Sequence, residues 1–570
     1  MGTRHAVAAG HYLAAEAGFD VLNNGGNAID AGVASGLALG VLQSDIVNSA
    51  GVAPTILWIA EEQKTINIDG LGHWPRALPQ DYFQREHDGT IPEGILRTVV
   101  PAAPASWLWA LERYGTMSFA NVAQYAIRYA RDGFPMYPLL QENIAIDKEN
   151  YRRWPSSAKV YLPDNHPPEV GDVFIQAELG KSLQYMADEE AGKTHDGREA
   201  GIRAAHDAFY KGDIARKFAQ YHADNGGFLT YDDMANYEVR VEPTVKTSVG
   251  DIELHCCGPW SQGPLLSQTL RLLEGYDLKS MSHNSAEYIH VLAEALKLSC
   301  ADRERYYGDP NFVDVPMTQL LSDDYTALRR SLIRDDTAWP EMPPPGDPVN
   351  GKATTAPGPA IPPPAPTPKD IREPATLDTS YICVVDSQGN AFSATPSDVS
   401  RSTPVIPGTG FCPSSRGSQS WGDPTHPSSA KAGKRPRLTP NPAMAFKDGK
   451  PFLLFGTPGG DVQSQAMLQV LLNQTLFGMD IQSAIEAPRF ATFSFPSSFE
   501  PHSYFPGRLN LEARIPKETG DALAKLGHRV EWWPDMTWRA AAVCAILVDY
   551  NKGVLHAGAD PRRPAYALGW

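Results

Sequence analysis

A proline-rich segment at about residues 340–375 constrains the fold of this chain more than any other feature. Proline lacks a backbone N–H and cannot join the interior of a sheet, so we expect an extended, flexible and solvated tether here. Residues 381–385 then form an apolar run that predicts a buried strand, and residues 391–395 can pair back with it as a hairpin. Thr379 therefore stands at the start of a predicted strand and at the end of a tether.

The position of Thr379 allows a specific chemistry. A threonine hydroxyl alone is a weak nucleophile, but an adjacent α-amine with a pKa near ~8 can act as its general base at neutral pH. Cleavage of the chain between Asp378 and Thr379 would create that amine. Taken alone, the stretch favours an ordinary strand residue at this position, and Ser380 and Thr376 are alternative nucleophiles. The rest of the chain decides between these interpretations.

The overall charge limits the partners. The chain has 570 residues and a formal net charge of -16, with an isoelectric point of about 5.4. Nucleic acids and anionic membranes attract basic surfaces, so this balance argues against both as partners.

The sequence has no apolar run of about 18 residues, and no apolar stretch typical of a signal peptide follows Met1. We expect a cytoplasmic protein, or a periplasmic one if a leader was removed before Met1.

The residue types that bind metals show no ligand pattern. The six cysteines lack CxxC or Cys/His zinc spacing, and the fifteen histidines include no HxxxH pair flanked by acids. We therefore expect neither a metal nor an organic cofactor. We interpret His73 and His290 as structural or substrate-facing side chains.

Several further elements can be predicted from residue patterns. Residues 31–42 are a helix of small residues, which can pack closely on its neighbours and is expected at the centre of the fold. Residues 53–60 and 64–69 predict a second hairpin, and residues 288–303 predict a long amphipathic helix. Another helix is expected over residues 463–476.

Short motifs occur in a fixed order along nearly the whole chain. Besides the strand after Thr379, they lie at residues 25–31, 131–135, 208–212, 301–303, 308–310, 457–460, 487–490 and 560–562. Each one alone is a weak signal. In this order they make the chain resemble the γ-glutamyltranspeptidase family of N-terminal-nucleophile hydrolases.

The resemblance implies both a fold and a domain organisation. The expected fold is α+β, a four-layer αββα sandwich that is completed by self-cleavage before Thr379. Residues 1–378 would form a large subunit and residues 379–570 a small subunit, together making one structural domain. The expected partners are therefore a small-molecule amide substrate and the protein's own second fragment, as one heterodimer or as a pair of heterodimers.

The resemblance also assigns catalytic roles. Thr379 corresponds to the nucleophile, and Ser397 stands where the family has a threonine that orients it. Gly459 and Gly460 fall at the family's oxyanion hole, where backbone N–H groups meet the negative charge that develops on the substrate carbonyl. Thr439 falls at one of two substrate-contacting serines of the family. Leu438 at the other serine position is a departure.

Larger departures affect the binding of a γ-glutamyl group. The arginine that holds its α-carboxylate in the family is replaced by Leu71, and Arg76 lies five residues further on. The places that hold its α-amine carry Val399, Arg416 and Gln419. Losing charged partners for a buried zwitterion is costly. We therefore expect apolar walls for the acyl pocket from Leu71, Trp74 and Val399, with His73 nearby and Arg416 as the charged contact.

Three functions remain open at this point. The first is an amidohydrolase that cleaves a small-molecule amide through an acyl-enzyme with a non-glutamyl acyl group, similar to the acylase-like branch of the family. The second is a γ-glutamyl hydrolase or transpeptidase that uses Arg76 or Arg416 in a rearranged site. The third is a non-catalytic relative, against which the intact Thr379, Gly459 and Gly460 count.

Overall fold

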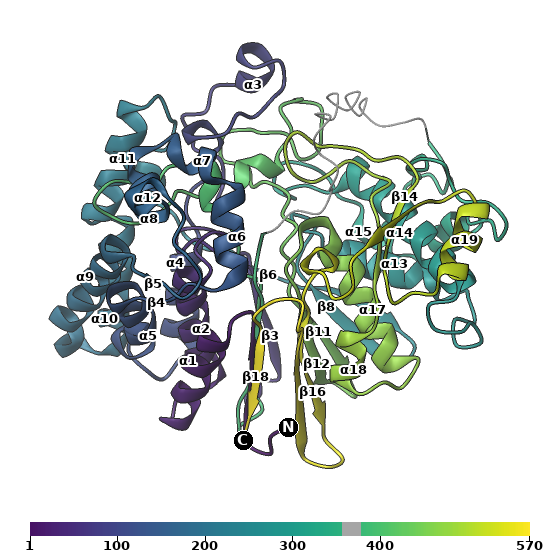
Figure 1. Ribbon diagram of the computed structural model, residues 1–570, viewed down its shortest axis with the longest axis horizontal. Helices are drawn as coiled ribbons and strands as arrows, with labels where there is room; N and C mark the ends of the chain where they lie inside the picture. The colour runs from purple at the N-terminus through teal and green to yellow at the C-terminus, as the bar shows by residue number, and fades with distance from the viewer. Residues whose placement is uncertain (356–377) are drawn as a thin grey trace.

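The computed structural model describes residues 1–355 and 378–570, and its centre consists of two β-sheets (Figure 1). The seven-stranded sheet has the order β18 (Tyr566–Gly569), β1 (Ala6–Ala9), β9 (Ile382–Val385), β10 (Ala391–Ala394), β2 (Thr55–Ile59), β3 (Lys64–Ile68) and β6 (Val241–Glu242). The six-stranded sheet has the order β17 (Val554–Ala559), β16 (Cys544–Asp549), β12 (Lys450–Gly456), β11 (Ala443–Lys447), β8 (Ile252–Cys256) and β7 (Val245–Val249).

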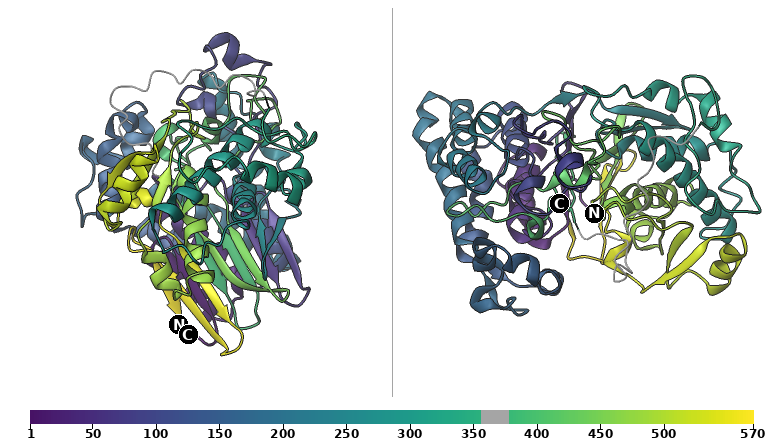
Figure 2. Two further views of the ribbon diagram at one scale, coloured as in Figure 1. Left: turned by 90° about the vertical axis from the view of Figure 1, so that its right-hand side faces the viewer. Right: turned by 90° about the horizontal axis from the view of Figure 1, so that it is seen from above.

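Helices cover the outer face of each sheet. On the side of the seven-stranded sheet lie α1 (Tyr12–Asn23), α2 (Ala28–Leu42), α4 (Ala103–Tyr114), α5 (Phe119–Asp132), α9 (Ala177–Lys193) and α10 (Arg198–Tyr210). On the side of the six-stranded sheet lie α13 (Gly263–Leu273), α14 (Ala286–Tyr306), α17 (Gln463–Thr475), α18 (Ile481–Glu486) and α19 (Lys517–Lys525). Seen from above in Figure 2, the helices occupy two opposite sides and both termini lie between them.

The alternation of side chains along the strands explains the four layers. Successive residues of a strand point to opposite faces. In β9, Val384 belongs to the buried cluster shared with α1 and α2, whereas Cys383 belongs to the cluster between the two sheets. In β12, Leu454 lies in that same middle cluster, and Leu453 lies in the cluster with α14 and α17. The predicted αββα sandwich is thereby confirmed.

Helix α2 has the central position that its small residues predict. All of its residues are buried, and a Cβ atom added to Gly32 would lie 2.3 Å from the ring of Phe392 in β10. The helix begins with a capping box, in which the Asn27 side chain accepts from Asp30 N. The small residues thus allow the helix to lie directly on the hairpin that follows Thr379.

Both sheets combine strands from the two sides of the predicted cleavage site. In the seven-stranded sheet, β1 lies between β18 and β9, and β10 pairs with β2. In the six-stranded sheet, β11 pairs with β8. Strands β1, β2 and β8 precede Thr379, and strands β9, β10, β11 and β18 follow it. The two predicted fragments therefore share both sheets through continuous backbone hydrogen bonding.

The first part of the proline-rich segment differs from the expected solvated tether. Residues 340–355 pack on the protein, with Pro343, Pro345 and Gly346 buried. Arg329 Nη1 donates to the Pro344 carbonyl over 2.9 Å, and the Asp302 carboxylate accepts from Gly346 N over 2.9 Å. Buried charged side chains thus bind backbone groups that the proline composition alone would leave to water. Residues 356–375 of the predicted tether lie outside the described residues.

Candidate active site

The hairpin of β9 and β10 positions the predicted nucleophile. Its antiparallel register pairs Ile382 with Ala394, and the same register, continued along both strands, places Thr379 opposite Ser397. The Thr379 Oγ1 atom lies 2.6 Å from the Ser397 Oγ atom. Both side chains are fully buried. The two predicted residues are therefore in hydrogen-bonding contact, which can hold the Thr379 hydroxyl in one orientation.

The backbone of Thr379 is strained. Its φ of 68° lies in the left-handed region, which is a genuine outlier for a β-branched residue and costs on the order of 1–3 kcal/mol. Its amide nitrogen donates to the Ile46 carbonyl oxygen over 3.1 Å. The alternative nucleophile Ser380 instead extends the hairpin pairing, with its amide donating to Pro396 O. Thr376 lies outside the described residues.

The predicted oxyanion glycines follow strand β12. Gly459 and Gly460 have φ values of 119° and 54°, a region that favours glycine. Gly460 N donates to Asp378 Oδ1 over 2.9 Å. The backbone donor therefore points at the residue that precedes Thr379, and in the uncleaved chain the Asp378 carboxylate occupies it.

Arg416 lies beside the predicted nucleophile and is only 1% exposed. It begins the short helix η5 (Arg416–Gln419). Its Nη2 atom donates to Ser397 Oγ, and its Nη1 atom donates to Asp378 Oδ2 over 3.3 Å. Burial raises the pKa of the neighbouring Asp398, and the charge of Arg416, whose Nε lies 3.8 Å away, opposes that rise. Arg416 is thus a buried cation beside Thr379 and Ser397.

Gln419, at the end of helix η5, connects Arg416 to Thr439, the residue predicted to contact the substrate. Arg416 Nη1 donates to Gln419 Oε1 over 3.4 Å, and Gln419 Nε2 donates to Thr439 Oγ1 over 3.0 Å. A continuous set of hydrogen bonds therefore runs from Thr379 to Thr439. Whether Thr439 and Gln419 contact a substrate stays a prediction.

The residues predicted to line the acyl pocket make no hydrogen bond with Thr379 in the described part of the chain. Trp74 is fully buried, donates through Nε1 to Ser420 Oγ over 2.9 Å and packs beside Gly417, so it supports helix η5. Leu71 lies in the core cluster between the two sheets. His73 is half-buried, its pKa is lowered by burial, and its Nδ1 atom lies 2.8 Å from Trp74 O. Val399 follows Asp398 and is 7% exposed. Their predicted roles toward a substrate stay predictions.

Arg563 is a site residue that the sequence motifs did not identify. Its Nη1 atom donates to the carbonyl oxygen of Asp378 over 3.2 Å and to that of Thr379 over 3.1 Å. Burial lowers its pKa to about 10, which still leaves it charged at neutral pH. The available signal was its position directly after the motif at residues 560–562.

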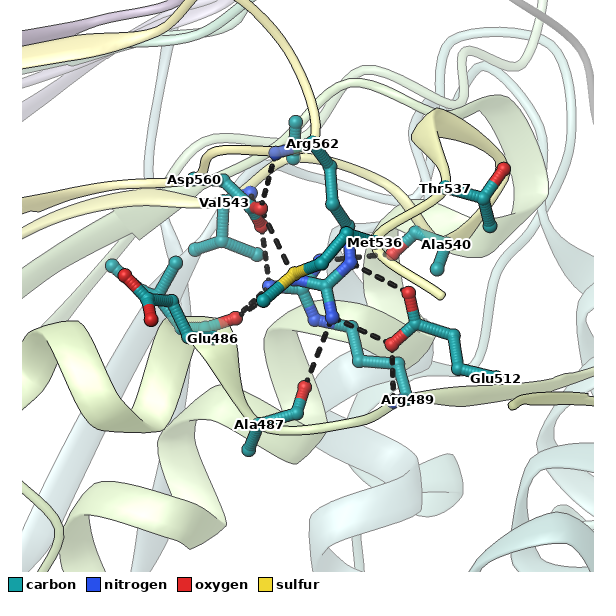
Figure 3. Close-up of polar contacts among 12 residues, drawn as sticks. Glu486, Ala487, Arg489, Glu512, Met536, Thr537, Ala540, Val543, Asp560 and Arg562 are labelled. Carbon is teal, nitrogen blue, oxygen red and sulfur yellow. Dashed lines mark hydrogen bonds and ion pairs between the residues drawn. The ribbon is translucent and has the colours of Figure 1, made fainter. Parts of the chain in front are cut away.

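A buried ion-pair network holds the turn that carries Arg563 (Figure 3). Arg562 Nε donates to Glu512 Oε1 over 2.8 Å, and Arg489 Nη2 donates to Asp560 Oδ2 over 2.5 Å. The Glu512 carboxylate also accepts from the backbone nitrogen of Arg489 over 2.8 Å, which ties both pairs together. The motifs at residues 487–490 and 560–562 thus meet in space and fix the C-terminal strand region beside the site.

One group of side chains outside this site could be considered for a metal. The ligand atoms of His290, Glu294 and His528 lie within 4.8 Å of one another, and all three residues are buried. However, His290 Nδ1 is 2.9 Å from His528 Nε2, and Lys297 Nζ donates to Glu294 Oε1 over 2.7 Å. The ammonium group neutralises the carboxylate and repels a cation. The group is therefore an internally paired polar cluster, and we assign no metal to it.

The fold and the site together define a class of protein. Two sheets between two helical layers, with a threonine at the start of a central strand, form an αββα sandwich of the N-terminal-nucleophile hydrolase type. Residues 14–570 match the family model described as Gamma-glutamyltranspeptidase. The chain belongs to the γ-glutamyltranspeptidase family, and the prediction of a hydrolase or acyltransferase of this family is confirmed.

The chain is similar to family members whose names describe two kinds of activity. The chain is 30% identical over 577 residues to the "Glutathione hydrolase-like YwrD proenzyme" of Bacillus subtilis (strain 168), covering 100% of this chain and 99% of the relative. It is 31% identical over 546 residues to the "Acylase ACY 1 proenzyme" of Pseudomonas sp. (strain SE83), covering 93% and 88%. The solved cephalosporin acylase from Bacillus halodurans superposes with a TM-score of 0.86 at 26% identity, covering 100% and 96%.

Proposed function

We propose that this protein is an amidohydrolase that cleaves its own chain between Asp378 and Thr379 and then uses Thr379 as an N-terminal nucleophile. The observation that carries the proposal is the 2.6 Å contact between the Thr379 and Ser397 hydroxyls beside the Gly460 N–H donor. After cleavage, residues 1–378 and 379–570 form a heterodimer. The names of two relatives, both proenzymes, support this order of events.

Burial and strain support self-cleavage over cutting by another protease. Asp378 and Thr379 are 1% and 0% exposed, so a protease could not reach the bond without unfolding this region. The φ of 68° at Thr379 stores strain that disappears when the bond to Asp378 breaks. Attack by the neighbouring hydroxyl requires no movement through the protein, because nucleophile and carbonyl belong to adjacent residues.

The same hydroxyl then performs turnover. Thr379 Oγ attacks the substrate amide carbon, and the free α-amine takes the hydroxyl proton and passes it to the leaving amine. Departure of Asp378 frees Gly460 N–H, which can then donate to the substrate oxyanion. Ser397 orients the hydroxyl. Water attacks the resulting ester, releases the acid and regenerates the threonine.

The charge of the site favours an acyl group other than γ-glutamyl. The resemblance assigns Arg416 to a position that holds the α-amine in the family, and Arg416 donates to the Asp378 carboxylate. A cation at this position should repel an ammonium group and attract an acid. Leu71, at the position of the carboxylate-binding arginine, offers no charge. The loss of two or three charge-assisted hydrogen bonds of about 1.5–3 kcal/mol each should weaken γ-glutamyl turnover roughly a thousandfold or more. The acyl group that fits has an apolar body and can carry one acid that meets Arg416.

The second candidate is γ-glutamyl hydrolysis or transfer on glutathione-like substrates. The name of the Bacillus subtilis relative favours it, since that relative is called glutathione hydrolase-like. The name of the Pseudomonas relative and the solved cephalosporin acylase favour the first candidate. The two candidates predict opposite orders of substrate preference.

A direct comparison of anilide substrates separates the candidates. We would measure kcat/KM for γ-glutamyl, butyryl and succinyl p-nitroanilides, with Thr379→Ala as the blank. Butyryl and succinyl are matched in length and differ by the acid. We expect succinyl to be the best and γ-glutamyl the worst, and Arg416→Gln to lower the succinyl rate more than the butyryl rate. A preference for γ-glutamyl would replace the first candidate by the second, and equal losses on both acyl substrates would remove the assigned role of Arg416.

A further inference from the structure

The proposed self-cleavage needs a donor for the oxyanion that forms on the Asp378 carbonyl oxygen. The glycine donor of turnover is not free for this step, because Gly460 N is already hydrogen-bonded to the Asp378 side chain over 2.9 Å. The carbonyl oxygen of the scissile bond instead faces Arg563, whose Nη1 atom lies 3.2 Å away. In the uncleaved chain, Gly460 N therefore binds the side-chain carboxylate of Asp378, whereas Arg563 binds its backbone carbonyl oxygen.

The guanidinium of Arg563 is buried, and its hydrogen bonds to the described residues all come from Nη1. Its side chain is 5% exposed, and within residues 1–355 and 378–570 its Nε and Nη2 atoms have no hydrogen-bond partner. Buried donors without acceptors are costly and uncommon. Nearby carboxylates of Asp378, Asp45 and Asp560 favour the charged form of Arg563. A cation that donates to a scissile carbonyl oxygen, as Arg563 does through Nη1, interacts more strongly with the oxyanion of the transition state than with the neutral carbonyl of the ground state.

We propose that Arg563 is a catalytic residue of the self-cleavage, which binds the oxyanion on Asp378 while Gly460 serves only in later turnover. The inference rests on the proposed self-cleavage. Thr379 Oγ forms a bond to the Asp378 carbonyl carbon, and the carbonyl electron pair moves to the oxygen held by Arg563. The oxygen then re-forms the carbonyl as the C–N bond breaks, and the Oγ proton ends on the Thr379 nitrogen. Water hydrolyses the ester, which leaves a carboxyl terminus on Asp378 and a free hydroxyl and amine on Thr379.

The surroundings keep Arg563 in place for this task. The paired residues Arg562 and Asp560 fix the turn before it (Figure 3), and Arg563 N donates to Asp560 O over 3.4 Å. A donor held in advance needs no reorganisation when charge develops. Arg563 also donates to Thr379 O over 3.1 Å, which is a contact with the nucleophile residue and not with the substrate carbonyl. We therefore expect the loss of Arg563 to affect turnover less than cleavage.

The test is a time course of cleavage of the full chain made by cell-free translation. Arg563→Gln removes the charge, Arg563→Lys keeps it at shorter reach, and Arg330→Gln is the matched control. Arg330 also donates to two backbone carbonyls, of Leu272 and Arg271, and neither belongs to the scissile bond. We expect cleavage to slow by roughly 100-fold in Arg563→Gln, the size of one lost oxyanion donor. Arg563→Lys should slow it less, and Arg330→Gln should leave it unchanged.

Folding is checked in chains that cannot cleave. The Thr379→Ala chain and the Thr379→Ala/Arg563→Gln chain should unfold at similar temperatures. In Arg563→Gln, the rate of substrate hydrolysis per cleaved molecule should fall by a smaller factor than the rate of self-cleavage. If the wild-type chain cleaves and Arg563→Gln cleaves equally fast, the inference is wrong while the proposed function stands. Equal losses in cleavage and hydrolysis, with a large fall in unfolding temperature, make Arg563 structural and also overturn it. A wild-type chain that never cleaves at Thr379 overturns the proposed function itself.

Discussion

Gly460 N donates to the Asp378 carboxylate, and in the proposed function it donates to the substrate oxyanion after cleavage. Its φ of 54° means that Gly460→Ala places a Cβ in a left-handed conformation at a cost of about 1–2 kcal/mol. We expect kcat/KM to fall on the order of 100-fold, the size seen for one oxyanion donor, with only a modest fall in unfolding temperature. Gly449→Ala is the control, since Gly449 has a φ of 74° in open space. An unchanged rate in Gly460→Ala would show that the oxyanion is held elsewhere.

Ser397 tests the orientation of the nucleophile. Ser397→Ala removes the 2.6 Å partner of Thr379 Oγ1 and leaves an Arg416 donor without its acceptor. We expect about a fivefold loss in both cleavage and turnover, since such a hydrogen bond contributes about 1 kcal/mol. Ser397→Thr keeps the hydroxyl and should retain most of the rate. Both rates are measured on the same preparation, and full activity in Ser397→Ala would contradict the assigned role.

At the scale of elements, the close contact of α2 with β10 predicts an overpacking defect. Gly32→Ala puts a methyl group 2.3 Å from the Phe392 ring, which should destabilise the protein by about 1–3 kcal/mol. Gly192→Ala in the last turn of α9 meets nothing within 4 Å and should be neutral or stabilising by about 0.5–1 kcal/mol. Thermal unfolding of the two variants decides this. Equal unfolding temperatures would mean that the helix can shift away from the hairpin.

The elements around the nucleophile were the predictable part of the molecule. The apolar run at residues 381–385 and the pairing of residues 391–395 with it predicted the hairpin of β9 and β10, and small residues predicted the buried α2. Their register then brings Thr379 to Ser397 without any long-range information.

Contacts between distant residues could not be predicted in the same way. Arg563 and Asp378 are 185 residues apart in sequence, and no periodicity links them. The proline content of residues 340–355 predicted a solvated tether. In the structure, the buried side chains of Asp302 and Arg329 bind the backbone of this segment, and composition alone does not reveal such contacts. A buried charge selects its partners by three-dimensional position, so such partners became visible only in the structure.

At the scale of the whole molecule, the interleaved sheets predict that cleavage does not separate the fragments. Strand β1 is hydrogen-bonded on both sides by strands of the C-terminal fragment, and β8 pairs with β11. We therefore expect the cleaved protein to elute as one species on gel filtration and its fragments to separate only in denaturant. No helix in the described part of the chain is both long and apolar enough to cross a membrane. Separate elution of the fragments under native conditions would contradict the shared sheets.

The most direct test of the central claim is mass spectrometry of the purified protein during turnover of an acyl anilide. One spectrum locates the new N-terminus and the covalent intermediate together. We predict two chains, residues 1–378 and 379–570, with the acyl group attached to Thr379 of the smaller one and absent from its Ser380. An intact chain that still hydrolyses substrate, a cut at another bond, or an acyl group on another residue would contradict the assignment of Thr379.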